Sequence, residues 1–185
     1  MLLFGQSAIV TGGSRGRGKS IALLLAAEGA DVVFTYISND AAANETVKEI
    51  EALNRKVIAL KIDAGSAAGA TEVVEKTIAE FGKINILVNN AGITRDTLLM
   101  RMSEDDWDAV LDNNLKGVFL LTKAAIRPIM RAKCGQLITI SSVLVLAGIR
   151  GQANYCATKD GLTGISKVRE NEVGQRGVTV TDMAP

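Results

Sequence analysis

Short runs of apolar and β-branched residues alternate with longer stretches of helical periodicity, and this alternation restricts the chain to few folds. A strand, a helix and a strand in repeated order predict right-handed crossovers and a parallel sheet covered on both faces. The predicted fold class is therefore α/β, a doubly wound parallel sheet of the Rossmann type. We expect six strands, at residues 8–11, 31–36, 56–60, 84–88, 136–141 and 177–183.

The composition excludes several functional classes. With 185 residues, 48% of them hydrophobic and 22% charged, the chain is expected to form a single domain over residues 1–185. Its 21 Lys and Arg residues against 20 Asp and Glu residues leave no basic excess for binding nucleic acid or a membrane. The sequence has no histidine, which excludes Ser-His-Asp and Cys-His catalysis and most catalytic zinc sites, so no metal site is expected.

No segment is typical of a membrane span or a targeting signal. The longest uncharged stretch, 134–149, has 16 residues and is interrupted by polar side chains, whereas a span needs about 20 apolar residues. The two cysteines, Cys134 and Cys156, form no disulfide framework and suit a reducing compartment as free thiols. We therefore expect a cytoplasmic protein, or one of an organelle stroma or matrix after import.

A loop with four glycines, at Gly12, Gly13, Gly16 and Gly18, follows the first strand and opens the first helix. Glycines allow the backbone to turn sharply and to approach a diphosphate, whose charge then lies at the helix N-terminus. Two ligand classes fit this loop. The spacing of Gly12, Gly16 and Gly18 is a variant of the dinucleotide-binding pattern.

Residues 13–20 also match the P-loop pattern, with Lys19 to reach the β- and γ-phosphates and Ser20 to bind magnesium. Asp63, at the end of an apolar strand, could supply the carboxylate for that magnesium ion. From the loop alone, a nucleotide triphosphatase and a dehydrogenase are both open.

Tyr155 and Lys159 are four residues apart, so both side chains lie on one face of the predicted helix. An adjacent ammonium favours the phenolate, and such a tyrosine can exchange a proton with a carbonyl or an alcohol. Ser142 ends the fifth strand, where its hydroxyl can hydrogen-bond a substrate oxygen. Taken singly, each of these residues also fits an ordinary structural role, as do Asn114 in its helix and Asn90 in its turn.

The combination of motifs is more specific than any one of them. TGxxxGxG at 11–18, NNAG at 89–92, NLKG at 114–117, ISS at 140–142 and YxxxK at 155–159 occur in this order. Together they resemble the short-chain dehydrogenase/reductase family along essentially the whole chain. Within it, ITRDTLLMRM at 93–102 and GQANY at 151–155 are similar to the 3-oxoacyl-[acyl-carrier-protein] reductases of fatty-acid biosynthesis.

The resemblance implies a tetrad and a cofactor site. Tyr155 would donate the proton, Ser142 would orient the ketone, Lys159 would bind the nicotinamide ribose, and Asn114 would hold a water that relays protons to Lys159. The implied cofactor-binding residues are Gly12, Ser14, Arg15, Gly16, Gly18, Asp63, Ala64, Asn90, Ala91, Tyr155 and Lys159. The resemblance thus implies an NADP-dependent oxidoreductase, and it makes the P-loop match a coincidence.

The cofactor choice also has a physical argument. An NAD enzyme places an acid near the end of the second strand, and that acid would repel a 2′-phosphate. Here 34–38 holds no acid, and the first one is Asp40. Arg15 supplies a guanidinium suited to a phosphate, so we expect NADPH.

The implied partner is an acyl carrier protein bearing a 3-oxoacyl group. Carrier proteins are acidic, and four cations, Arg127, Arg131, Lys133 and Arg176, are candidates for the docking surface. Alternatively these cations complement helix C-termini.

The family implies a homo-oligomer, but Arg169 and Glu170 interrupt the apolar stripe of the helix that follows Tyr155. The family pattern also continues beyond Pro185, so we expect a fold truncated before the last strand. An oligomer is therefore doubtful for this chain, and a non-catalytic NADP-binding module remains an alternative to an active reductase.

Overall fold

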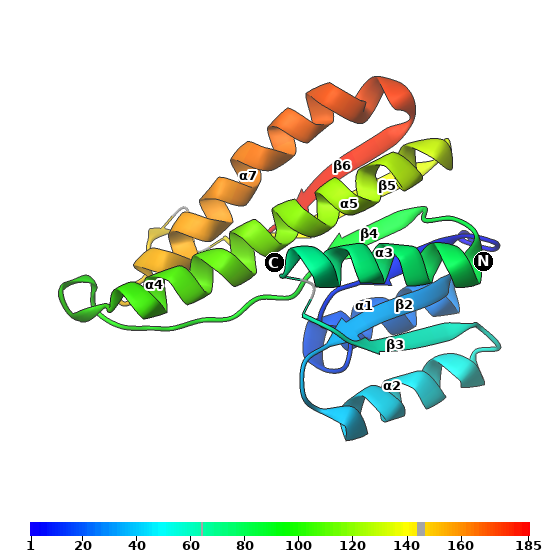
Figure 1. Ribbon diagram of the computed structural model, residues 1–185, viewed down its shortest axis with the longest axis horizontal. Coiled ribbons are helices and arrows are strands. Elements are labelled where there is room, and N and C mark those ends of the chain that lie inside the picture. The colour runs from blue at the N-terminus through cyan, green and yellow to red at the C-terminus, as the bar shows by residue number, and fades with distance from the viewer. Residues whose placement is uncertain (64, 144–146) are drawn as a thin grey trace.

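The protein is described by a computed structural model, which covers residues 1–63, 65–143 and 147–185 (Figure 1). Its strands are β1 (Ser7–Val10), β2 (Asp31–Tyr36), β3 (Val57–Lys61), β4 (Ile86–Asn89), β5 (Gly135–Ile140) and β6 (Val178–Met183). Its α-helices are α1 (Gly16–Ala27), α2 (Asp40–Ala52), α3 (Ala67–Phe81), α4 (Glu104–Leu111), α5 (Gly117–Arg131) and α7 (Ala153–Val173). Three short turns of helix are η1 (Leu99–Arg101), η2 (Asp112–Lys116) and η3 (Gly174–Arg176).

The six strands form one parallel sheet in the order β3-β2-β1-β4-β5-β6. The predicted doubly wound α/β fold is thus confirmed, and each strand overlaps its predicted range. The chain order reverses between β1 and β4, which are neighbours. In sheets of this kind, ligands bind beyond the carboxyl ends of the strands at that point.

Alternate residues of each strand enter two separate hydrophobic cores. Ile9 of β1 packs in the core under α3 and α5, whereas its neighbours Ala8 and Val10 pack in the core under α1 and α2. Figure 1 shows α3 and α5 lying across one face of the sheet. Burial on both faces explains why the strands are continuously apolar in the sequence.

The helix that begins after Ser103 is interrupted by a wider turn. Ser103 caps α4 by accepting a hydrogen bond from the backbone N–H of Asp106 at 3.1 Å. Residues 112–116 then form a π-helical turn before α5 begins at Gly117. Pro128 lies inside α5, which ends three residues later at Arg131. Turns of this kind often occur at functional positions, and this one contains Asn114.

Arg169 lies on the inner face of α7, toward the sheet. Its side chain is 4% exposed, and its Nη1 donates a weak hydrogen bond to Thr139 Oγ1 of β5 at 3.5 Å. Its Nη2 has no partner among the described residues, and burial lowers the pKa of the guanidinium, partly offset by the charge of Asp182. The arginine predicted to interrupt the apolar stripe of this helix is therefore buried within one chain.

In the part of the chain that the structure covers, no helix is both long and apolar enough to cross a bilayer.

Candidate active site

The glycine loop between β1 and α1 is shaped by two backbone conformations that favour glycine. Gly12 and Gly16 have φ of +70° and +54°, in the left-handed region. Gly13 is instead required for space, because a Cβ there would lie 2.5 Å from the Cβ of Phe34, which is fully buried. A Cβ on Gly18 would overlap the carbonyl oxygen of Gly12. The loop therefore leaves an open backbone cradle at the start of α1.

Thr11 and Asn90 join this loop to the turn after β4. The hydroxyl oxygen of Thr11 accepts hydrogen bonds from the backbone N–H groups of Asn90 and Ala91, both at 2.9 Å. The amide of Asn90 donates in return to the carbonyl oxygen of Thr11 at 2.9 Å. These bonds cross the switch point between β1 and β4, so the two loops form one rigid floor.

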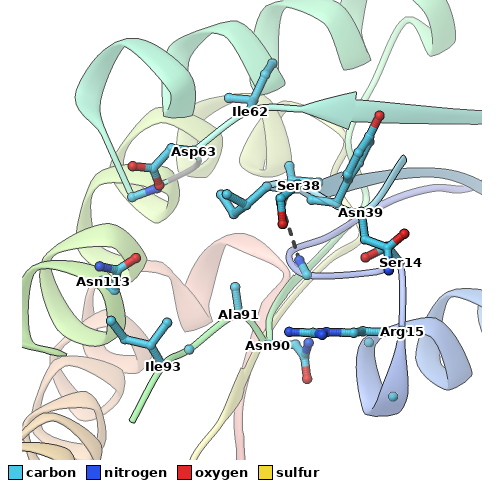
Figure 2. Close-up of a pocket in the computed structure, with 18 of the residues that line it drawn as sticks. Ser14, Arg15, Ser38, Asn39, Ile62, Asp63, Asn90, Ala91, Ile93 and Asn113 are labelled. Atoms are coloured by element: carbon cyan, nitrogen blue, oxygen red, sulfur yellow. Dashed lines mark hydrogen bonds between the residues drawn. The ribbon is translucent and has the colours of Figure 1, made fainter. Parts of the chain in front are cut away.

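A cavity of about 490 Å³ opens above this floor, at the carboxyl ends of β1, β2 and β4. Figure 2 shows the loop residues Ser14 and Arg15, the turn residues Asn90 and Ala91, and Asp63 after β3 arranged around it. Of the predicted cofactor-binding residues, eight line the cavity: Gly12, Ser14, Arg15, Gly16, Gly18, Asp63, Asn90 and Ala91. The predicted cofactor-binding set did not include other residues that line the cavity, among them Arg17, Tyr36, Ser38, Asn39, Ile93 and Asn113.

The charged lining of the cavity suits a phosphate-rich ligand. Arg15 and Arg17 are its cations, and Asp63 is the one acid among the described lining residues. Asp63 Oδ1 accepts a hydrogen bond from the backbone N–H of Gly65 at 2.8 Å. The N-terminus of α1 adds partial positive charge at the same place. An open cradle, two guanidinium groups and a helix N-terminus are what the phosphates of a dinucleotide require.

Asp40, the first acid after β2, is not among the described residues that line the cavity. Its carboxylate accepts a hydrogen bond from Lys61 Nζ at 2.8 Å, which holds the pKa of Asp40 below its usual value. The lining at the end of β2 consists of uncharged residues, from Thr35 to Asn39. No described carboxylate therefore faces the cavity where it would repel a 2′-phosphate.

The geometry contradicts the P-loop alternative. Lys19 Nζ lies 2.9 Å from a carboxylate oxygen of Glu49 and 3.3 Å from one of Glu45, both on α2. The hydroxyl of Ser20 donates to the carbonyl oxygen of Gly16 at 3.2 Å. Neither Lys19 nor Ser20 lines the cavity. The lysine that would bind phosphates in a triphosphatase therefore pairs with two acids of α2 instead. The triphosphatase hypothesis is wrong.

Lys159 and Tyr155 lie together near the end of β5. Lys159 is 4% exposed, and its Nζ donates to the carbonyl oxygen of Ile140, the last residue of β5, at 2.6 Å. The same Nζ lies 5.6 Å from the centroid of the Tyr155 ring. The pKa of Lys159 is lowered to about 8, chiefly because burial disfavours the ammonium, and also because the charge of Arg17 acts on it. Ser142, half-buried, follows β5 by two residues.

Asn114 is fully buried and uses both polar atoms of its side chain on one residue. Its Oδ1 accepts from the backbone N–H of Ile93 at 2.8 Å, and its Nδ2 donates to the carbonyl oxygen of Ile93 at 2.9 Å. Asn114 therefore positions the segment after β4. Its implied part in a proton relay stays a prediction.

Two amides that precede Tyr155 hold the same segment. Asn154, fully buried, donates to the carbonyl oxygen of Arg95 at 3.1 Å, and Gln152 donates to Asp96 Oδ2 at 2.9 Å. Prediction from sequence treated these amides only as part of a family signature. Their position directly before a candidate proton donor, at a helix start, was the signal that could have indicated a positioning role.

The predicted tetrad does not line the cavity. Ser142, Tyr155 and Lys159 lie next to the end of β5, one strand beyond the β4 turn, and Asn114 contacts Ile93 on the cavity wall. Ala64 lies outside the described residues. A second cavity, of about 580 Å³ between α5 and α7, is lined by no residue predicted for the site.

The four predicted docking cations lie near the amino ends of β5 and β6. Arg127 and Arg131 lie in the C-terminal part of α5, Lys133 precedes the start of β5, and Arg176 precedes the start of β6. The carboxyl ends of these strands, where Ser142 and Tyr155 lie, are at the opposite edge. Within one chain the candidate docking surface is therefore remote from the site.

Comparisons with known proteins agree with this geometry. A family profile described as short chain dehydrogenase matches residues 6–185. A 3-oxoacyl-[acyl-carrier-protein] reductase of Synechocystis sp. is 47% identical over 183 residues, 99% of this chain and 74% of that protein. The corresponding reductase of Salmonella typhimurium is 47% identical over 181 residues, 98% of this chain and 72% of that protein.

A solved structure gives the same result for the fold. The crystal structure of a putative short-chain alcohol dehydrogenase from Sinorhizobium meliloti matches with a TM-score of 0.94 and 34% identity, over 99% of this chain and 72% of that one. Since the profile match extends from β1 through the glycine loop and the Tyr155 helix to the end of the described sheet, this chain belongs to the short-chain dehydrogenase family.

Proposed function

We propose that this protein uses NADPH to reduce 3-oxoacyl groups on acyl carrier protein to 3-hydroxyacyl groups in fatty-acid biosynthesis. The observation that carries the proposal is the buried ammonium of Lys159, 5.6 Å from the Tyr155 ring centroid, in a fold whose cavity has a glycine loop and two arginines suited to phosphates. The named activity of the relatives from Synechocystis and Salmonella, at 47% identity, supports the substrate class. We further propose that residues 1–185 act as one cofactor-binding and catalytic domain, in the cytoplasm or an organelle stroma or matrix.

The chain's own residues would perform the proton transfer. When bound, NADPH supplies the hydride for the ketone carbon. The phenol of Tyr155 donates a proton to the ketone oxygen, and the nearby ammonium of Lys159 stabilises the phenolate that remains. The hydroxyl of Ser142 donates a hydrogen bond to the same oxygen as negative charge develops on it.

NADPH, rather than NADH, is the proposed cofactor because of the charges around the cavity. Arg15 lines it, while Asp40 is paired with Lys61 and lies outside the described lining. Gly12, Ser14, Gly16, Gly18, Asn90 and Ala91 would hold the dinucleotide along the floor. Asp63, with Ala64 by resemblance, would hold the adenine.

The test is the oxidation of NADPH, followed by its absorbance, with acetoacetyl-acyl carrier protein as substrate. Tyr155→Phe should lower the rate by about 100-fold or more, because general acid catalysis contributes at least that much. Lys167→Met, at an exposed position of the same helix, is the matched control and should keep the parent rate. A Tyr155→Phe rate within about twofold of the parent would show that the assigned acid is wrong.

We also propose that copies of the chain associate through α5 and α7. Phe119 and Val168 are 46% and 56% exposed and border the cavity between these helices. The burial of Arg169 inside one chain removes the expected cost of burying it against a second copy. Light scattering should detect an oligomer, and Val168→Asp should dissociate it without lowering the thermal stability of the monomer.

A further inference from the structure

Arg17 is the cation of the cavity for which the dinucleotide site so far has no role. It lies in the first turn of α1 and lines the cavity, with its side chain exposed. Among the described residues, its guanidinium makes no ion pair and no hydrogen bond. Lys19, two residues later, is by contrast held by Glu45 and Glu49. The Arg17 guanidinium thus stays available to a ligand in the cavity.

Both neighbours of Arg17 in the first turn of α1 are glycines, so neither of them covers the adjacent backbone with a side chain. Gly16, with φ of +54°, has open space where a Cβ would point, and Gly18 packs directly on the carbonyl of Gly12. A phosphate at the N-terminus of α1 would therefore meet backbone N–H groups and the side chain of Arg17. A guanidinium can donate two parallel hydrogen bonds to the oxygens of such a group.

The positive charge of Arg17 also acts on Lys159, where it adds to the effect of burial in lowering the pKa of that ammonium. Lys159 has no acidic partner among the described residues, and its Nζ is bonded to the carbonyl oxygen of Ile140. Arg17 lines the cavity and Lys159 lies near the end of β5, so an anion bound by Arg17 would also offset the repulsion between these two cations.

We propose that Arg17 binds the diphosphate of the dinucleotide, while Arg15 binds the 2′-phosphate. This inference rests on the proposed dinucleotide cofactor. It assigns the two arginines to two different parts of that cofactor. Arg17 would serve NADPH and NADH equally, because both contain the diphosphate, and Arg15 alone would discriminate between them.

Binding measurements on cofactor fragments separate these roles without any turnover. Dissociation constants are measured by calorimetry for NADPH, NADH, ADP-ribose, which has the diphosphate without the 2′-phosphate, and 2′-AMP, which has the 2′-phosphate and no 5′-phosphate. Arg17→Gln should weaken the binding of NADPH, NADH and ADP-ribose by about 10-fold each and leave that of 2′-AMP unchanged. Arg15→Gln should weaken the binding of NADPH and 2′-AMP and leave that of NADH and ADP-ribose unchanged.

Lys83→Gln is the matched control, because it removes one exposed positive charge before β4, at the opposite edge of the sheet. It should change none of the four dissociation constants by more than about twofold at moderate salt. Unchanged ADP-ribose affinity in Arg17→Gln would overturn the inference, as would a loss confined to the Michaelis constant of the ketone substrate. If the parent protein binds none of the four ligands, the proposed cofactor is wrong and the role of Arg17 falls with it.

Discussion

Replacing Lys159 by methionine tests how much the buried charge of its ammonium lowers the free energy of unfolding, independently of catalysis. The folded chain holds this group at a pKa of about 8, below the ordinary value of 10.5, because burial penalises its charge. At about 1.4 kcal/mol per pKa unit, this difference corresponds to about 3.5 kcal/mol that opposes folding while the lysine is charged. Methionine keeps most of the side-chain length and removes the charge.

The sign of the pH dependence follows from the two pKa values. The unfolded chain binds the proton of Lys159 more tightly than the folded chain, so the cost is fully present below pH 8. Between pH 8 and 10.5 the folded chain loses this proton first, and the cost declines as the pH rises. The parent protein should therefore gain about 2.5 kcal/mol of stability from this group between about pH 7 and 10.

The assay is urea denaturation of both proteins at several pH values. Both carry Tyr155→Phe, so that ionisation of the neighbouring phenol cannot contribute. The stability advantage of Lys159→Met over its parent should shrink by about 2.5 kcal/mol over this range. Loss of the hydrogen bond to the carbonyl oxygen of Ile140 adds an offset of about 1–3 kcal/mol, but that offset does not vary with pH.

Lys167→Met, at an exposed position of α7, controls for the removal of an ammonium from the same helix. If the difference in free energy of unfolding between the Lys159→Met protein and its parent stays constant within about 0.5 kcal/mol across this pH range, that result refutes the reasoning. It would mean that the folded chain binds the proton of Lys159 as tightly as the unfolded chain.

Three further changes test other parts of the structure. Gly18→Ala should abolish protection by NADP against thermal unfolding, because its Cβ would overlap the Gly12 carbonyl; Gly174→Ala, where a Cβ meets nothing within 4 Å, should retain that protection. Arg169→Leu should raise the free energy of unfolding by about 1–3 kcal/mol, because its buried Nη2 has no described partner, and a decrease in urea denaturation would contradict this. Lys19→Ala should leave NADP protection intact, and ATP should protect neither protein; protection by ATP would restore the P-loop reading.

The sequence was sufficient to predict the sheet because its signal is local. The runs at 31–36 and 56–60 become β2 and β3 within one residue at each end. Burial on both faces of a parallel sheet demands continuous apolar strands, and few other structures do so. The glycine loop was equally predictable, since positive φ at Gly12 favours glycine and the close contact at Gly13 leaves no space for a Cβ.

The partners of the polar side chains could not be predicted in the same way. Asn114 contacts Ile93, 21 residues away, and Lys19 contacts Glu45 and Glu49 on another helix. A motif gives the residue types and their spacing along the chain, whereas these contacts depend on how separate elements pack. The P-loop pattern at 13–20 is an example. It gives the position of Lys19 in the sequence but not its ion pairs with two acids of another helix, which keep it from binding a phosphate.

Arg169 shows a different limit of periodicity. A spacing of three and four residues places Leu162, Ile165 and Arg169 on one face of α7, but it does not say whether that face meets the sheet or a second chain. In the structure it meets the sheet, since Leu162 is fully buried and Arg169 is 4% exposed. The residues that accommodate the arginine, Thr139 and Asp182, are register partners on β5 and β6. Only the pairing of two strands brings them together beneath one helix, so the inward direction of Arg169 follows from sheet register and not from the sequence of α7.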